Sequence, residues 1–262
     1  GGFATTASAF RDFLAQNHLD QRIEHVLAIL DIGNVTALAQ TGNEIRNWVM
    51  SASLPARLQD EITRAYEKMQ MDARQHDISV AVRSSATAED LADASFAGQQ
   101  ETLLNICGLE NLLTAIKHVF ASLYGDRAIA YRVHKGFAHA DVALSAGIQH
   151  MIRSDAGASG VIFTLDTESG FDQVVLVTAS YGLGEAIVQG IVNPDEFYVY
   201  KPALAQGKFA IIKRSLGSKL VQIQYAQNPA AHHTVETRAV PIAQQNCFAI
   251  TDDEVEELAR QA

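Results

Sequence analysis

The sequence predicts an α+β fold with two lobes and a cleft between them. Three observations predict it. Apolar residues recur at helical spacing through residues 4–75, they alternate with a period of two from Ile78, and strand-like segments fill most of the chain after Val142. Helices followed by a run of strands are typical of α+β packing rather than of a regular alternation of strand and helix.

The amino-acid composition is that of an ordinary globular protein. The 262 residues carry 20 Lys and Arg against 30 Asp and Glu, a formal net charge of −10, and 48% of them are apolar. Such a chain can bury a core, and its acidic balance disfavours nucleic-acid binding. Two cysteines make no disulfide framework, so we expect both unpaired in a reducing compartment. No apolar run nears the roughly 20 residues that span a bilayer. We expect a cytoplasmic protein that crosses no membrane.

The opening Gly-Gly-Phe predicts a turn, and helices follow it. Thr5 or Thr6 can cap the first helix, and Pro55 suits the first turn of a later one. The apolar stripes of these helices are interpreted as core: Phe10, Phe13, Leu14; Ile23, Val26, Leu27, Leu30; Ile45, Trp48, Val49; Leu58, Ile62, Tyr66, Met69.

Strands dominate the rest of the chain. Ile78, Val80 and Val82 alternate with smaller residues and predict a strand that ends at Arg83, while residues 109–135 predict one long helix. Residues 226–246 have no clear period, and a capping box at Thr251–Glu254 opens a last helix. Further strands are expected at 101–106, 142–152, 160–165, 174–179, 196–200, 209–213 and 220–225.

The first candidate site follows Val82. Arg83 is succeeded by almost twenty small and hydroxyl-bearing residues that include Gly98 and end at Thr102. Small residues let the backbone approach a ligand, successive N–H groups can form an anion site, and a guanidinium suits phosphate oxygens. The alternative is a surface loop with a solvated Arg83, because the spacing of a phosphate-binding P-loop and its Lys are absent. The residues alone leave both interpretations open.

The second candidate is the segment Tyr181-Gly-Leu-Gly-Glu185. Its glycines allow close approach of the backbone, and Glu185 could bond a ribose hydroxyl, support an Arg or help hold a metal through water. A tight strand–helix connection with an exposed Glu185 is an equal alternative.

The third candidate is Gln149-His-Met-Ile152, at the end of a predicted strand. A strand that links two lobes can offer backbone N–H and C=O groups to a flat base, with Met151 as adaptable apolar padding. Met151 as ordinary core is the alternative. The nine histidines show no ligand spacing with cysteine, so no metal site is predicted.

Together these segments closely resemble the N-terminal ATP-binding domain of the phosphoenolpyruvate synthase family, the pyruvate, water dikinases. VAVRSSATAEDLADASFAGQQETLLNI, ALSAGIQHMIRSDAGASGVIFTLDTESGFD and GLGEAIVQGIVNPDEFYVYKP carry the resemblance. It covers nearly the whole chain, most loosely at 202–250. The SFAGQQET motif is not typical of the related dikinases that use inorganic phosphate. Rifampicin phosphotransferases have a similar loop, so that family remains an alternative.

The resemblance implies an ATP-grasp-like, two-lobed nucleotide-binding fold, with a helical N-terminal part and then mixed or antiparallel sheets. Arg83 would hold the phosphates of ATP, Gly98 and Thr102 would close over them, and Gln149, Met151 and Ile152 would contact adenine. By the same resemblance, Glu185 of the GLGE motif would belong to the nucleotide site. ATP, with Mg²⁺, would donate its β-phosphoryl to a histidine on a swivelling domain, leaving AMP and phosphate, and pyruvate would then accept the phosphoryl.

The resemblance also sets expectations about boundaries. We expect residues 1–76 to be the helical part of the first lobe and 77–262 the nucleotide-binding region, in a fragment of a longer multidomain chain. The family's phosphate-binding Lys lies upstream of Gly1, and the metal-binding segment and the phosphorylated His lie beyond Ala262. We therefore expect this piece to be inactive alone. A non-catalytic nucleotide-binding module is the alternative from another functional class, and a homodimer is left open.

Overall fold

A computed structural model of the chain describes residues 1–87, 90–91, 94–95, 102–230 and 233–262. Contacts divide the chain into two compact units: unit 1 is Gly1–Met151 and unit 2 is Ile152–Ala262. The helical residues 1–76 are thus one part of unit 1. The assignment of 77–262 as the nucleotide-binding region stays a prediction. No helix of the described residues is both long and apolar enough to cross a bilayer.

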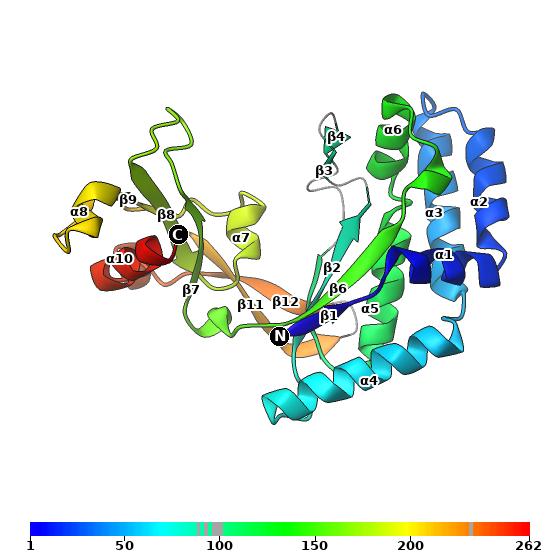
Figure 1. Cartoon of the computed structure of the whole chain (residues 1–262), viewed down its shortest axis with the longest axis horizontal. Coiled ribbons are helices and arrows are strands. Elements are labelled where there is room, and N and C mark those ends of the chain that lie inside the picture. Colours follow the sequence, from blue (N-terminus) through cyan, green and yellow to red (C-terminus); the bar gives the residue numbers. More distant parts are fainter. Residues whose placement is uncertain (88–89, 92–93, 96–101, 231–232) are drawn as a thin grey trace. The chain divides into compact units, whose positions relative to one another are not determined.

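Unit 1 is a four-stranded antiparallel sheet with helices packed on one face (Figure 1). The strand order is β1-β6-β2-β5, and α5 and α1 contact the sheet directly. The strands are β1 (Gly2–Ala4), β2 (Val80–Ala86), β5 (Thr102–Ile106) and β6 (Leu144–His150), with a separate pair β3 (Asp90–Leu91) and β4 (Ala94–Ser95). The helices are α1 (Ala7–Gln16), α2 (Leu19–Ala28), α3 (Val35–Ser51), α4 (Ala56–Ala73), α5 (Leu109–Ser122), α6 (Asp126–Lys135) and the 3₁₀ turn η1 (His139–Asp141).

The core of unit 1 lies between the helices and the sheet. The predicted helical stripes are confirmed: Phe10 and Phe13 are buried against Phe120 of α5, with ring centroids 5.1 and 5.5 Å away. Val80 and Val82 of β2 are fully buried, as the alternation predicted. Thr6 caps α1 by accepting a hydrogen bond from the Ala9 N–H. The local spacing of apolar residues therefore accounts for the helices and the core of unit 1.

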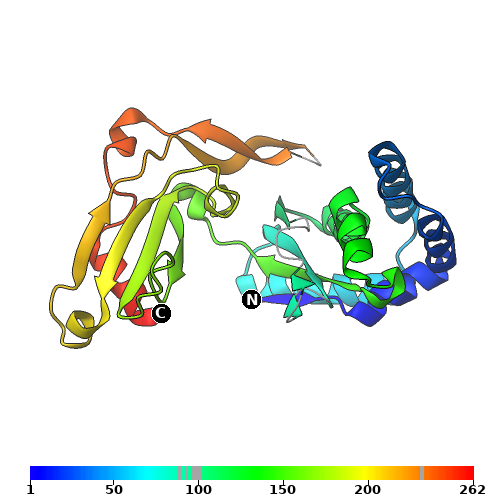
Figure 2. The same cartoon turned by 90° about the horizontal axis from the view of Figure 1, so that it is seen from above.

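Unit 2 is a second antiparallel sheet, in the order β10-β9-β8-β7, with α10 packed against β8 and β9. A long hairpin of β11 and β12 forms a ribbon of its own (Figure 2). The strands are β7 (Ala158–Phe163), β8 (Val174–Tyr181), β9 (Asp195–Tyr200), β10 (Ile211–Ser215), β11 (Val221–Ala230) and β12 (His233–Ala239). The helices are η2 (Ser154–Ala156), α7 (Glu185–Val188), α8 (Lys201–Ala205), α9 (Ile242–Gln245) and α10 (Asp252–Gln261), the last opened by the predicted capping box.

Several local predictions were wrong. Residues 2–4 form a strand rather than a turn, because Phe3 pairs with Ile148 far along the chain. The helix predicted over 109–135 is two helices, α5 and α6, with Gly125 as the N-cap of the second. Residues 226–246, which show no clear period and were expected to be a peripheral excursion, contain the end of β11 and the strand β12 that pairs with it. Both cysteines are free, as expected, but their apolar sequence neighbours also predict strand-like surroundings, and Cys247 is instead exposed after α9.

Candidate functional site

One face of the unit 1 sheet carries small and polar residues instead of core. Alternation along β2 sends Val80 and Val82 to the helix side and Arg83 to the opposite side. The registers of the four strands bring the following residues to that opposite face: Gly2 and Ala4 of β1; Ser145, Gly147 and Gln149 of β6; Ala81, Arg83 and Ser85 of β2; Thr102 of β5. A flat ligand can approach the backbone closely over such a face.

Arg83 stands in the middle of this face. The sequence predicted that its strand ends there, which was wrong: β2 continues to Ala86. Arg83 is therefore paired on both sides, with Thr102 of β5 and Gly147 of β6 as its Cα partners. Directly opposed residues in antiparallel strands have Cβ atoms about 4.5–5.5 Å apart, so the Thr102 hydroxyl lies beside the Arg83 stem. Both side chains are exposed.

The Arg83 guanidinium has no ion-pair partner among the described residues. If Arg83 has no role in binding, the sequence offers Glu89 or Asp90 as a surface ion-pair partner, but those side chains lie outside the described part of the chain, as does Gly98. The structure thus brings Arg83 and Thr102 together across a strand pair. It presents a permanent cation next to a hydroxyl on an open, small-residue face, which is a suitable environment for phosphate oxygens.

Gln149, Met151 and Ile152 lie where the chain leaves unit 1. Gln149 is exposed on the Arg83 face, where its Cα partner in β2 is Ala81, two residues before Arg83. The Met151 N–H donates to the Ser79 carbonyl at 3.0 Å. Met151 is the last residue of unit 1, and Ile152, which is 79% exposed, is the first of unit 2. The segment does link two compact units, while its contact with a base stays a prediction.

Glu185 lies in unit 2, at the start of α7 after the glycine turn. Gly182 has φ +82°, and a Cβ there would stand 2.5 Å from the Ile223 carbonyl oxygen, so only glycine fits. Glu185 is half-buried and accepts a hydrogen bond from Gln189 at 2.7 Å. Burial raises the pKa of its carboxyl, and the Gln189 bond opposes that shift. The turn is therefore built for a definite placement of Glu185.

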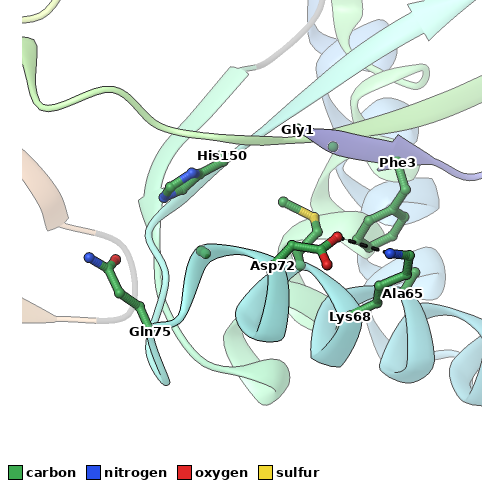
Figure 3. Close-up of a pocket in the computed structure, with 10 residues that line it drawn as sticks. Gly1, Phe3, Ala65, Lys68, Asp72, Gln75 and His150 are labelled. Carbon is green, nitrogen blue, oxygen red and sulfur yellow. Dashed lines mark hydrogen bonds and ion pairs between the residues drawn. The ribbon is translucent and has the colours of Figure 1, made fainter.

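A cavity of about 430 Å³ lies on the other side of the unit 1 sheet, between α4 and the strands β1 and β6 (Figure 3). Phe3 and Met69 line it with Lys68, Asp72 and His150, and Lys68 pairs with Asp72 at 3.0 Å. His150 shares the helix side of β6 with the buried Ile148, whereas Gln149 points to the Arg83 face. Sequence reasoning missed this cavity, because β1 was not predicted to pair with β6.

No group of three His, Cys, Asp or Glu side chains suited to a metal ion occurs in the described part of the chain.

Comparison with known proteins supplies an independent finding. A family model described as "Pyruvate phosphate dikinase, AMP/ATP-binding domain" matches residues 1–262. Curated relatives named phosphoenolpyruvate synthase are 61% identical in Neisseria meningitidis and 54% identical in Escherichia coli. A probable phosphoenolpyruvate synthase of Staphylothermus marinus is 35% identical. Each alignment covers 100% of this chain and 33% of the relative, so the chain spans about a third of their length.

Proposed function

Because the chain belongs to the pyruvate phosphate dikinase AMP/ATP-binding domain family, we propose that it is the ATP-binding part of a cytoplasmic phosphoenolpyruvate synthase. The whole enzyme would convert ATP, pyruvate and water to phosphoenolpyruvate, AMP and phosphate. The names of the relatives support this reaction over rifampicin phosphotransfer or a non-catalytic module. Other domains would supply the phosphorylated histidine and the pyruvate site.

The observation that carries the proposal is the pairing of Arg83 with Thr102 on the open face of the unit 1 sheet. Arg83 offers two parallel N–H donors to phosphate oxygens, and Thr102 adds a hydroxyl. Phosphoryl transfer needs mainly positioned cations and hydrogen-bond donors, which stabilise the charge that develops on the moving phosphoryl group. A guanidinium anchored in a strand paired on both sides is well held for that task.

The remaining residues are proposed to bind the rest of the nucleotide. Gln149, Met151 and Ile152 offer backbone and side-chain groups to adenine, and Glu185 bonds a ribose hydroxyl. Gly98 is proposed to close over the phosphates, whereas Thr102, paired with Arg83 in the sheet, contributes its hydroxyl in place. Mg²⁺ would neutralise phosphate charge, and we assign it no ligand in this chain.

The test is ATP-dependent AMP formation by the full-length enzyme with Arg83→Ala. Loss of a charge-assisted contact costs about 1.5–3 kcal/mol, so AMP formation should fall at least tenfold. The melting temperature should stay nearly unchanged, because the side chain is exposed. Arg83→Lys should not restore full activity, since an ammonium lacks the two parallel donors.

Arg57→Ala is the matched control. Arg57 is an exposed arginine of the same unit whose hydrogen-bonded ion-pair partner is Glu61 on its own helix, at 2.9 Å. Its loss should leave AMP formation within twofold of wild type. Wild-type turnover in a folded Arg83→Ala enzyme would remove Arg83 from the site and, with it, the main support for the proposal.

A further inference from the structure

The strand β5 contains a β-bulge at the edge of the unit 1 sheet. Val82 pairs with Leu103 and Val80 with Ile106, so two residues of β5, Leu104 and Asn105, stand opposite the single residue Ala81. Asn105 has φ +55°, a left-handed conformation that is uncommon outside glycine, although asparagine tolerates it best. Bulges re-aim backbone and side-chain groups and are over-represented beside active sites.

The bulge turns Asn105 toward the end of β6. Asn105 is 8% exposed, and its backbone N–H donates to the Met151 Sδ at 2.9 Å. Its side-chain Oδ1 accepts a hydrogen bond from the Ser79 hydroxyl at 2.9 Å. The Ser79 carbonyl in turn accepts the Met151 N–H at 3.0 Å. Ser79, Asn105 and Met151 thus form one cluster, in which Met151 is held at both its backbone and its sulfur.

The position of this cluster is informative. It lies at the boundary between the units, beside the exposed Gln149 and Ile152. In a regular strand the Asn105 N–H would take part in the hydrogen-bond pattern of the sheet edge. Here it donates to a thioether sulfur, which is only a weak acceptor. The uncommon backbone conformation at Asn105 thus directs its N–H at the Met151 sulfur and fixes the orientation of Met151. Local strain of this kind is retained where geometry matters for function.

We infer that Asn105 is a positioning residue for the nucleotide base: its bulge holds Met151 so that the segment Gln149–Ile152 presents its backbone to adenine at a fixed distance. The inference rests on the proposed function, which places adenine on that segment. It extends the site to a residue that does not touch the ligand. It also predicts a consequence for specificity, because backbone N–H and C=O groups distinguish adenine from guanine only when they are held in register with the edge of the base.

The test measures the dissociation constants of ATP and GTP for the full-length enzyme, as wild type, Asn105→Ala and Met151→Leu, by calorimetry, together with thermal melting. Alanine is strained at φ +55° and lacks Oδ1, and leucine keeps the volume of methionine without the sulfur. Each variant should lower the preference for ATP over GTP at least fivefold. Because both substitutions release the same contact, the double variant should lose little more than either single one.

Asn111→Ala is the control, since Asn111 is exposed and bonds only the Cys107 carbonyl among the described residues, at 2.9 Å. It should leave the ATP preference unchanged. A purely structural role for Asn105 would lower the melting temperature and leave the ratio of the two constants at its wild-type value, which would overturn the inference alone. If Asn105→Ala does not fold, Ser79→Ala decides, because it removes the hydroxyl that holds the Asn105 side chain. A full-length wild-type enzyme that binds neither nucleotide would overturn both this inference and the ATP site beneath it.

Discussion

The buried ion pair of unit 2 permits a sharp stability prediction. Asp195 and Lys219 are both fully buried, with 2.5 Å between Oδ1 and Nζ. The carboxylate also accepts the N–H groups of Gly217 and Ala249, each at 2.8 Å, and the ammonium also donates to the Gly217 carbonyl at 2.9 Å. One carboxylate therefore joins the start of β9, the loop before β11 and the turn before α10.

The substitution Asp195→Asn keeps the size of the side chain and removes its charge. The Lys219 ammonium is then left in the core without a counter-charge, and breaking a buried pair in this way costs about 3–5 kcal/mol. For a unit of this size the loss corresponds to a fall in melting temperature of roughly 10 °C or more. Lys219→Met should cost a similar amount. The double variant should lose clearly less than the sum, because no charge is left unpaired.

Urea unfolding followed by far-UV circular dichroism measures these losses. The single tryptophan, Trp48, lies in unit 1, so its fluorescence reports on that unit separately. Asp72→Asn is the matched control: its pair with Lys68 spans 3.0 Å, but the side chains are 68% and 71% exposed. That pair is worth about 0–1 kcal/mol. A loss in Asp195→Asn no larger than in Asp72→Asn, or a double variant with the full sum, would refute the reasoning.

Three further predictions concern acid stability, the glycine turn and activity. Burial and the neighbouring Arg132 cation lower the pKa of His139 to about 4. Below about pH 6.5 the unfolded chain therefore binds a proton that the native chain does not bind, so the free energy of unfolding should fall between pH 6.5 and 4. His139→Gln should flatten the dependence of the melting temperature on pH over that range, and an unchanged slope would contradict this. Gly182→Ala should cost about 1–3 kcal/mol in urea unfolding because of its φ of +82° and the close Ile223 carbonyl, whereas Gly207→Ala, with φ +66° and open space, should cost less; equal losses would argue against a steric role. The isolated chain with ATP, Mg²⁺ and pyruvate should form no AMP above the blank, and steady AMP production would show that it carries the complete machinery.

Much of the fold was predictable because it rests on local patterns. The stripes that begin at Phe10 and Phe13, the alternation of Val80 and Val82, and the capping box at Thr251 each act within a few residues. The family resemblance was equally readable, since the motifs around Arg83 and Glu185 are contiguous in the chain.

Other features depend on pairing across long stretches of chain. The residues around Gly2 do not predict that it pairs with Gln149, and the residues of β12 do not predict that this strand pairs with β11. The bulge at Asn105 appears only when the register of β5 against β2 is known, because it is defined by one extra residue between two pairs.

By itself, the sequence determined most of the helices and strands, the apolar side chains that form the core, and the family to which the chain belongs, but not β1, β12 or the division between α5 and α6. Only the tertiary structure decided that Arg83 lies in mid-strand beside Thr102, that Gln149 shares its face, and that Asn105 holds Met151. The physical reason is that periodicity assigns a side chain to a face from its immediate neighbours. Its partner on the next strand is set by a register that distant hydrogen bonds and packing choose together.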